Sequence, residues 1–418
     1  MTNKNLSTDS YKGVRDFYPE DMAVQQYIFS TWAKTAESFG FERYDASVLE
    51  PSELYKAKGA ENEEMVNEQT YTFTDRGGRE VTLRPEMTPT VARMIAGRWR
   101  ELASKAPIRW YSIPNMFRYE RMQKGRLREH WQFNCDIFGV NDVSMDVEII
   151  ALAYQIFKNF GATDDMFTIY VNNRATMQLA YQSLGITDAQ TITTITRLND
   201  KKDKISGSEY LEKLNDITND SELSTTIKKM IEAEDSGDNA VVAGLRELGI
   251  KNVILDRSLA RGFDYYTGTI FEIKDTSGEN NRTLCGGGRY DNLTSMFGND
   301  AVSGIGFGFG DVSLRDFLET HKLLPDNLSF TTAIVVIPMD EALNLEAQKI
   351  AKQIRDKGIS VSVDAGKKRV GEKIGRASDK GVEKVIVIGE NEVSTQVFTL
   401  KNLKSGEEKT GSLLEIIV

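Results

Sequence analysis

The sequence predicts an α+β domain built on an antiparallel sheet, followed by a small α/β domain. Strand signals separated by tight turns recur before residue 310, beginning on the two sides of Gly77-Gly78, and such hairpins belong to antiparallel sheets. A polar and mostly helical stretch at about residues 175–250 interrupts them. Beyond residue 330 strands and helices alternate, as they do in an α/β domain.

The chain length favours at least two domains, since 418 residues exceed what a single hydrophobic core usually fills. We place the first domain at residues 1–325, with the helical stretch at about residues 175–250 as an insertion within it. The second domain is expected at residues 331–418, after a polar linker at residues 321–330.

Hydrophobic periodicity predicts the elements of the two domains in order. Apolar residues three and four positions apart indicate helices, and alternating apolar residues indicate strands. In the first domain the expected elements are a helix over residues 24–39, a hairpin over 71–83, strands at 108–113 and 129–139, a helix over 147–157 and strands between 253 and 309. In the second they are a strand at 333–337, a helix at 343–354, and strands at 359–363 and 385–388 that bracket a helical stretch.

Composition excludes several classes of protein. An apolar share of 40% and a charged share of 27% are ordinary for a folded soluble chain. No apolar run reaches the roughly 18 residues that span a bilayer, and the first ten residues lack a signal-peptide core. Two cysteines and two histidines exclude a disulfide framework and a zinc or multi-histidine centre. We therefore expect a cytoplasmic protein with no resident metal and no membrane contact.

The net charge of −10 is unevenly distributed. Residues 331–418 carry 14 Lys and Arg against 13 Asp and Glu, whereas the rest of the chain carries 38 against 49. Lys367, Lys368 and Arg369 form a basic run within the nearly neutral second domain. Such a run suits an anionic partner, although a solvated charged surface is the commoner explanation.

The strand expected at residues 129–137 has one polar and one apolar face, because successive side chains point to opposite sides of a strand. The even positions hold polar residues, namely His130, Gln132, Asn134 and Asp136. The odd positions hold mostly apolar ones, namely Trp131, Phe133, Cys135 and Ile137. The preceding loop places five cations within eleven residues, from Arg118 to Arg128. Cations beside a polar sheet surface suit a polyphosphate ligand, although a solvated sheet face is the alternative.

Two further segments carry residue patterns suited to ligand binding. The stretch Arg261-Gly-Phe-Asp-Tyr-Tyr266 joins a cation to paired tyrosines, which offer stacking surface and hydroxyl groups but also occur in ordinary hairpin cores. The stretches Cys285–Asp291 and Ser303–Gly310 are rich in glycine, yet they complete neither a Rossmann fingerprint nor a Walker A loop. Alternating glycines in a strand favour a flat surface against which a ring can lie. Any phosphates are then held by arginines on an antiparallel sheet.

These segments together resemble the histidyl-tRNA synthetases, a family of class II aminoacyl-tRNA synthetases, over nearly the whole chain. Lys12–Pro19 is similar to the opening motif of that family, and Gly40–Pro51 to class motif 1. Thr82–Thr88 resembles the amino-acid loop, and Phe117–Asp136 resembles motif 2. Arg261–Tyr266 resembles the block that distinguishes the histidine enzymes. The resemblance implies a class II catalytic domain with a helical insertion, followed by an α/β anticodon-binding domain.

The resemblance also implies roles for individual residues. Arg118 and Arg261 are the implied catalytic cations, both on the α-phosphate of ATP. Two more ATP contacts are implied, from Glu120 to the adenine amino group and from Arg126 to the outer phosphates. The residues implied for histidine are Glu86, Thr88, Gln132, Asp136, Tyr265 and Tyr266. The basic run of Lys367, Lys368 and Arg369 is the expected tRNA contact, and Lys373 and Arg376 follow it along a helix.

Two positions depart from the family pattern. Asp136 stands where the family usually has Glu, so the pocket for the imidazole ring must close in or use a water molecule. Motif 3 usually ends with an arginine after the glycine strand, but Ser313 occupies that register and Arg315 lies two residues later. The contact to the γ-phosphate is then made by Arg315, by Arg126 or by neither.

The implied activity is ATP-dependent ligation of histidine to its tRNA through histidyl-adenylate, with Mg²⁺ bridging the phosphates. The expected partners are tRNA, L-histidine, ATP and a second copy of the chain in a homodimer. One alternative is a non-catalytic, synthetase-like regulatory subunit of ATP phosphoribosyltransferase, and another is a class II enzyme for a different amino acid. Regulatory subunits of that kind lack the carboxy-terminal domain and have an eroded Arg-Gly-x-Asp-Tyr-Tyr block, whereas this chain has both.

Overall fold

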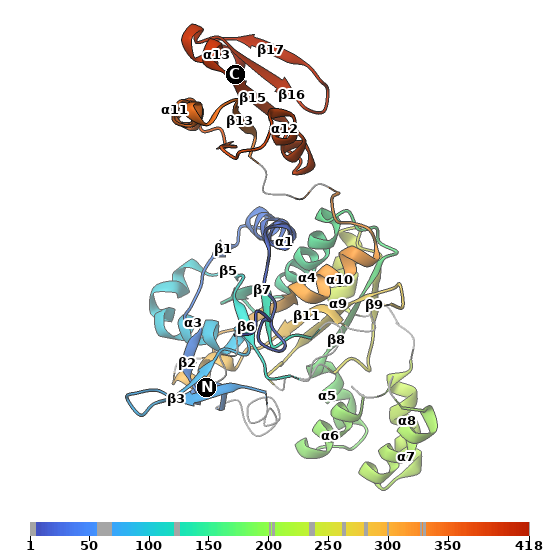
Figure 1. Ribbon diagram of the computed structural model, residues 1–418. Helices are drawn as coiled ribbons and strands as arrows, with labels where there is room; N and C mark the ends of the chain where they lie inside the picture. Colours follow the sequence, from blue (N-terminus) through green and yellow to red (C-terminus); the bar gives the residue numbers. More distant parts are fainter. Residues whose placement is uncertain are drawn as a thin grey trace. The chain divides into compact units, whose positions relative to one another are not determined.

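The structure is a computed structural model that divides into two compact units, one of Met1–Asp16 with Ile28–Leu324 and one of Phe17–Tyr27 with Pro325–Val418 (Figure 1). The residues that it describes are 6–56, 69–120, 126–199, 202, 205–233, 239–260, 265–279, 283–298, 301–326, 328 and 332–417. No helix among these residues is long and apolar enough to cross a bilayer.

The first unit is built on a nine-stranded sheet with the order β1-β5-β7-β12-β11-β10-β8-β9, and β6 pairs with β7 beside this path. Its strands are β1 (Glu42–Arg43), β5 (Ile108–Ser112), β6 (Asn115–Phe117), β7 (Glu129–Phe138), β8 (Phe167–Asn173), β9 (Val253–Leu255), β10 (Thr269–Asp275), β11 (Thr283–Arg289) and β12 (Gly304–Gly310). All neighbours run antiparallel except β1 with β5 and β8 with β9. The predicted fold class is confirmed.

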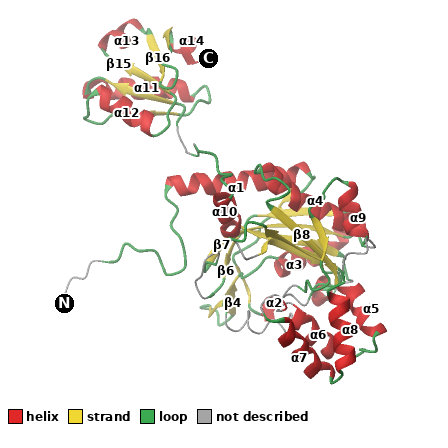
Figure 2. Cartoon of the chain, turned by 90° about the vertical axis from the view of Figure 1, so that its right-hand side faces the viewer, coloured by secondary structure: helices red, strands yellow, loops and turns green. Residues whose placement is uncertain are grey.

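Three helices cover one face of this sheet, namely the part of α1 (Pro19–Ser38) that belongs to this unit, α4 (Val143–Asn159) and α10 (Asp311–Thr320) (Figures 1 and 2). Their aromatic side chains pack on those of the sheet. The ring of Trp32 lies 5.4 Å from that of Phe133, and the ring of Phe157 lies 5.2 Å from that of Phe309. Because this face is a packed core, the opposite face of the central strands is left for polar groups.

That opposite face is bordered by α3 (Thr88–Leu102) and by a small three-stranded sheet. The small sheet consists of β2 (Leu49–Pro51), β4 (Glu80–Leu83) and β3 (Tyr71–Thr74), and α2 (Glu53–Lys56) follows β2. The predicted hairpin is confirmed, since β3 and β4 pair antiparallel with Thr74 opposite Glu80. In its turn, a carboxylate oxygen of Asp75 accepts hydrogen bonds from the amides of Gly77 and Arg79.

A group of helices between β8 and β9 has a hydrophobic core of its own (Figures 1 and 2). It comprises α5 (Arg174–Ser183), α6 (Ala189–Asn199), α7 (Gly207–Thr218) and α8 (Ser221–Ile231). The buried side chains of Tyr181, Asn199 and Tyr210 form a hydrogen-bonded chain within that core. The next helix, α9 (Ala240–Glu247), packs instead on α4, where a Cβ on Gly244 would lie 2.8 Å from Val147.

The second unit contains a five-stranded sheet of order β14-β13-β15-β16-β17. Its strands are β13 (Ile334–Pro338), β14 (Val361–Val363), β15 (Lys384–Ile388), β16 (Phe398–Asn402) and β17 (Glu408–Gly411). Its helices are α11 (Asn344–Arg355), α12 (Val370–Asp379), α13 (Glu390–Thr395) and α14 (Leu413–Ile417). Strands β13, β14 and β15 and helices α11 and α12 match the predicted alternation, whereas the antiparallel hairpin β16–β17 and the last two helices were not predicted.

Candidate active site

A pocket opens on the polar face of the central strands of the large sheet. It is lined by Glu86, Thr88, Arg118, Gln132, Asp136, Tyr265, Tyr266, Gly286, Tyr290, Gly306, Phe307 and Gly308. The six residues implied for histidine and the cation Arg118 are therefore brought together from four separate stretches of the chain. Arg261, the second implied cation, lies outside the described residues, so the structure places it neither in the pocket nor elsewhere.

Glycines form the floor of the pocket because they leave room for the polar side chains of β7. Gly306 of β12 pairs with Asp136, and a Cβ built on that glycine would lie 2.1 Å from the Asp136 carboxylate. A Cβ on Gly308 would lie 2.4 Å from the amide nitrogen of Gln132. The alternating glycines therefore line the pocket, and the side chains of Asp136 and Gln132 lie over them.

Gly306→Ala is accordingly expected to displace Asp136 and to raise the KM for histidine by about tenfold or more, while the KM for ATP changes little. The two constants would be measured by histidine-dependent exchange of pyrophosphate into ATP. Gly375→Ala, at a position in the second unit where an added Cβ meets no other atom, is the control. Unchanged histidine affinity in Gly306→Ala would contradict this description of the floor.

Asp136 is a buried carboxylate of the pocket, with 4% of its surface exposed. Burial raises its pKa to about 7, and a hydrogen bond donated by the hydroxyl of Tyr290 opposes that rise. The same surroundings hold the pKa of the Tyr290 hydroxyl well above 10, because burial and the nearby carboxylate disfavour the phenolate. Tyr290 was not predicted as a site residue, although it lies in the glycine-rich segment singled out above.

The loop that carries Glu86 and Thr88 is held by a buried arginine. The guanidinium of Arg84 donates to the carbonyl oxygen of Asn115 at 2.9 Å and to that of Ala46 at 2.7 Å. Glu86 is 2% exposed, and the hydroxyl of Tyr265 lies 3.4 Å from its carboxylate. A fixed buried carboxylate at this position suits an ammonium group.

Arg118 joins this loop to the start of β7. Its Nε donates to the carbonyl oxygen of Pro85 at 2.8 Å, which leaves the outer nitrogens of its guanidinium directed elsewhere. One of them lies 3.9 Å from the carboxylate of Glu120, whose other oxygen lies 3.0 Å from the guanidinium of the half-exposed Arg126. The basic loop residues 121–125 lie outside the described residues.

His130 shares the polar face of β7 with Gln132 and Asp136. Burial lowers the pKa of its imidazole to about 3, and the positive charges of Arg118 and Arg15 lower it further. The ring is therefore neutral at physiological pH and adds no charge to the pocket.

Ser313 and Arg315, the residues at and after the expected end of motif 3, both bind groups outside the pocket. The hydroxyl of Ser313 lies 3.1 Å from the carbonyl oxygens of Leu284 and Gly310. The guanidinium of Arg315 lies 2.8 Å from the carboxylate of Glu319, one helical turn further along. Among the described residues, no group of three or more His, Cys, Asp or Glu side chains could hold a metal ion.

The sequence matches known families over both units. Residues 13–311 match the profile of histidyl-tRNA synthetase, and residues 333–417 match that of an anticodon binding domain. The chain belongs to the histidyl-tRNA synthetase family. The family inferred from the sequence motifs is confirmed.

Members of the histidyl-tRNA synthetase family are similar over the full length of the chain. A histidine–tRNA ligase from Leptospira biflexa is 42% identical, across 100% of this chain and 98% of the relative. One from Thermoplasma volcanium is 36% identical, across 99% and 98%. The crystal structure of histidyl-tRNA synthetase from Nostoc sp. PCC 7120 shares the fold, with a TM-score of 0.81 at 24% identity and 99% coverage of both chains.

The basic run of the anticodon-binding unit is exposed just before α12. Lys367, Lys368 and Arg369 are all exposed, with the ammonium of Lys367 lying 3.8 Å from Glu341. Lys373 was expected on the same exposed surface but is buried, because its ammonium donates to the carbonyl oxygen of Pro338 at 3.0 Å. That hydrogen bond holds Lys373 inside the unit.

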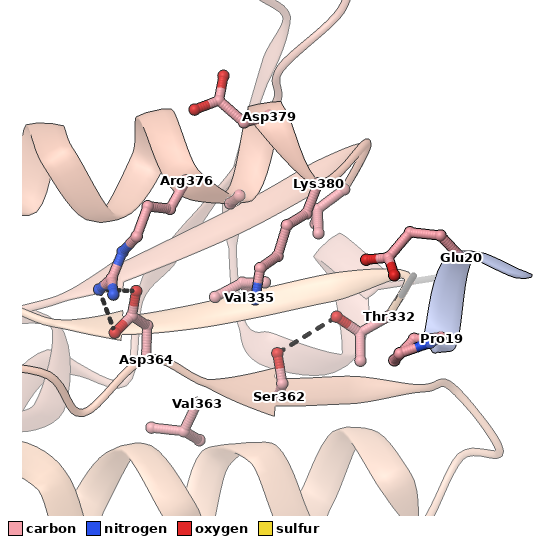
Figure 3. Close-up of a pocket in the computed structure, with 12 residues that line it drawn as sticks. Pro19, Glu20, Thr332, Val335, Ser362, Val363, Asp364, Arg376, Asp379 and Lys380 are labelled. Carbon is pink, nitrogen blue, oxygen red and sulfur yellow. Dashed lines mark hydrogen bonds and ion pairs between the residues drawn. The ribbon is translucent and has the colours of Figure 1, made fainter. Parts of the chain in front are cut away.

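A separate hollow of the same unit lies beside α12 (Figure 3). The guanidinium of Arg376 binds both carboxylate oxygens of Asp364 there, at 2.9 and 2.7 Å. The side-chain hydroxyls of Thr332 and Ser362 lie 3.2 Å apart in the same hollow. Arg376, which was expected to face a phosphate, is thus already engaged by a carboxylate.

Proposed function

We propose that the protein is an ATP-dependent histidine–tRNA ligase, which activates L-histidine as histidyl-adenylate and transfers it to its tRNA. The observation that carries this proposal is the buried carboxylate of Asp136 at the base of a pocket that also holds Glu86 and Arg118. Activated histidine has three polar ends. Asp136 can accept a hydrogen bond from its imidazole ring, Glu86 can bind its ammonium group, and Arg118 can bind its carboxylate or phosphate.

Histidine is proposed to enter with its imidazole ring toward Asp136 and Tyr290. Tyr265 and Tyr266 then lie along the ring, and Glu86 with Thr88 binds the α-ammonium group. Gln132, whose side chain lies over Gly308 of the floor, is proposed to lie near the α-ammonium group. The Asp136 carboxylate would accept a charge-assisted hydrogen bond from the imidazole N–H of histidine. An amino acid with an apolar side chain of the same size would leave that carboxylate unpaired.

ATP is proposed to lie along the same sheet face with its α-phosphate at Arg118 and Arg261. Glu120 is proposed to accept a hydrogen bond from the adenine amino group, and Arg126 is proposed to reach the outer phosphates. The carboxylate of histidine attacks the α-phosphorus, the bond to the bridging oxygen breaks, and pyrophosphate leaves. Positive groups fixed beside the α-phosphate stabilise the charge that develops on its oxygens, and no side-chain nucleophile is needed.

Mg²⁺ is proposed to enter with ATP as part of the substrate, bound to its phosphates. In the second step a ribose hydroxyl at the 3′ end of the tRNA attacks the carbonyl carbon of the adenylate and AMP leaves. The anticodon-binding unit is the proposed tRNA contact. We further propose that the protein is a cytoplasmic homodimer with a catalytic domain at residues 1–325, a helical insertion at about 175–250 and an anticodon-binding domain at 331–418.

The regulatory-subunit alternative is less well supported. The relatives that match over the full length of this chain are named histidine–tRNA ligases, and the anticodon-binding unit is present. The pocket also holds the six side chains proposed for histidine and the cation Arg118.

Exchange of labelled pyrophosphate into ATP, measured with each amino acid in turn, tests the proposed function. Exchange with histidine alone is the expected result, followed by charging of tRNA in the presence of histidine. Exchange with another amino acid would show that this amino acid, and not histidine, is the substrate. The absence of exchange with every amino acid would support a regulatory protein.

Replacing Lys367, Lys368 and Arg369 together by Ala is expected to weaken tRNA binding and to make it less sensitive to salt. Each lost phosphate contact should reduce the slope of log K against log salt by about 0.7–0.9. Histidine-dependent pyrophosphate exchange should stay unchanged, because the run lies in the other unit. The matched control replaces three exposed lysines of the same unit, Lys349, Lys352 and Lys357, and an equal loss in the control would reject the assignment.

A further inference from the structure

An arginine from the opening segment lies at the end of the strands that form the pocket. The guanidinium of Arg15 donates to the carboxylate of Asp311 at 2.7 Å. The Asp311 side chain is completely buried, and its other oxygen accepts the backbone amide of Trp131 at 2.9 Å. Asp311 is therefore fixed from two sides, and it fixes the direction of the Arg15 guanidinium in turn.

The position of this pair is set by the ends of β12 and β7. Gly310, the last residue of β12, pairs with Gln132 of the pocket, and Asp311 follows it as the first residue of α10. Where β12 has ended, the opening segment lies beside the start of β7, since the amide of Arg128 donates to the carbonyl oxygen of Gly13 at 2.7 Å. Arg15 is thus bound to Asp311, which lies three residues beyond Gly308, the last glycine of β12 that lines the pocket.

Two positively charged side chains of this region act on one neutral ring. Arg118 of the pocket and Arg15 both act electrostatically on the imidazole of His130, which lies on the pocket face two residues before Gln132. Asp311 balances one positive charge from the buried side, whereas the Arg15 side chain remains 22% exposed. Two guanidinium groups that both act on one uncharged ring favour an anionic ligand near them.

The arginine that usually ends motif 3 is absent at this end of the site. Position 313 holds a serine whose hydroxyl is within hydrogen-bonding distance of backbone carbonyls. Arg315 extends along α10 to Glu319. Arg15 reaches the same junction of β12 and α10 from a distant part of the chain, 296 positions away from Asp311.

We propose that Arg15 binds the outer phosphates of ATP, with Asp311 orienting its guanidinium, and so supplies the positive charge that Ser313 does not. This assignment rests on the proposed function, because it takes ATP as the ligand of the pocket. Asp311 is a positioning residue that acts through Arg15 and makes no contact with the nucleotide.

The test is the pair of Michaelis constants for ATP and histidine in pyrophosphate exchange. Arg15→Ala is expected to raise the KM for ATP by about 10- to 100-fold, as the loss of one charge-assisted contact does, and to leave the KM for histidine within about twofold. Arg15→Lys should restore part of the ATP affinity because it keeps the charge. Asp311→Asn should shift the same constant in the same direction as Arg15→Ala.

Arg109→Ala is the matched control, because it removes an arginine that is similarly exposed and paired with a carboxylate, Glu148, on the opposite face of the sheet. It is expected to leave both Michaelis constants unchanged. Melting temperatures of all variants show whether any of them is simply unfolded. An unchanged KM for ATP in a folded Arg15→Ala protein, or equal rises for ATP and histidine, would overturn the assignment.

The same design separates this inference from the proposed function. If the wild-type protein shows no histidine-dependent exchange, the proposed function fails. Calorimetric titration of ATP into the wild-type and Arg15→Ala proteins then decides the role of Arg15 directly. Weaker ATP binding in the variant supports the role, and equal binding rejects it.

Discussion

Arg118→Ala is expected to lower the rate of histidyl-adenylate formation by about 100- to 10,000-fold. The guanidinium is anchored through its Nε to the carbonyl oxygen of Pro85, so it is already in place when charge develops on the α-phosphate. Single-turnover formation of the adenylate, followed with labelled ATP, measures the effect. Arg118→Lys should recover little of the rate, because a compact ammonium group lacks the rigid planar set of donors with which a guanidinium holds Pro85 and faces a phosphate at once.

The control for this prediction is again Arg109→Ala on the helix-covered face. An Arg118→Ala protein that forms the adenylate at a near-normal rate would show that the reacting α-phosphate lies elsewhere. A loss confined to the affinity for histidine would assign Arg118 to the amino acid alone.

Asp136→Asn is expected to raise the KM for histidine by about 10- to 100-fold and to leave the KM for ATP nearly unchanged. In the wild-type protein the KM for histidine should rise as the pH falls through about 7, because the carboxylate that accepts the imidazole N–H becomes protonated there. The KM of the Asp136→Asn variant should show no such rise near pH 7. Exchange kinetics between pH 6 and pH 9 on both proteins make the comparison, and an identical pH profile for the two would contradict the role.

The same substitution has an expected effect on stability with a definite sign. The pKa of Asp136 is raised from 3.8 to about 7 by burial, so the folded state holds a proton that the unfolded state has already released between these pH values. The wild-type protein therefore loses stability as the pH rises through this range, and Asn does not. Asp136→Asn should gain stability relative to the wild type by roughly 2–3 kcal/mol on going from pH 5 to pH 8.

Urea unfolding of the two proteins at both pH values measures that difference. A stability difference that does not change between pH 5 and pH 8 would mean that the carboxyl group titrates normally in the folded protein. In that case the midpoint expected for histidine binding near pH 7 would also be lost.

Local patterns in the sequence were sufficient for much of the large sheet. The alternation of β7 separated Gln132 and Asp136 from Phe133, and the structure places the first two in the pocket and the third in the core. The alternating glycines of β12 predicted a surface for a flat ligand ring, and the structure places Gly306 and Gly308 in the lining of the pocket. These features depend on residues two positions apart, where strand geometry is enough.

Contacts between distant residues were not predictable in the same way. Tyr290 meets Asp136 across 154 positions, and Arg15 meets Asp311 across 296, so only the three-dimensional fold reveals either pair. Lys373 lies in a polar helix but is buried by a hydrogen bond to the backbone of a neighbouring strand. The strand β17 (Glu-Lys-Thr-Gly) contains no apolar residue, so periodicity carries no signal for it.

A crystal structure with a hydrolysis-resistant analogue of histidyl-adenylate would show directly how the pocket binds its substrate. We expect the imidazole ring at the Asp136 carboxylate and the Tyr290 hydroxyl, the α-ammonium group at Glu86, and the α-phosphate position at Arg118. An analogue bound away from the glycine floor, or bound there with its imidazole ring turned from Asp136, would contradict this expectation.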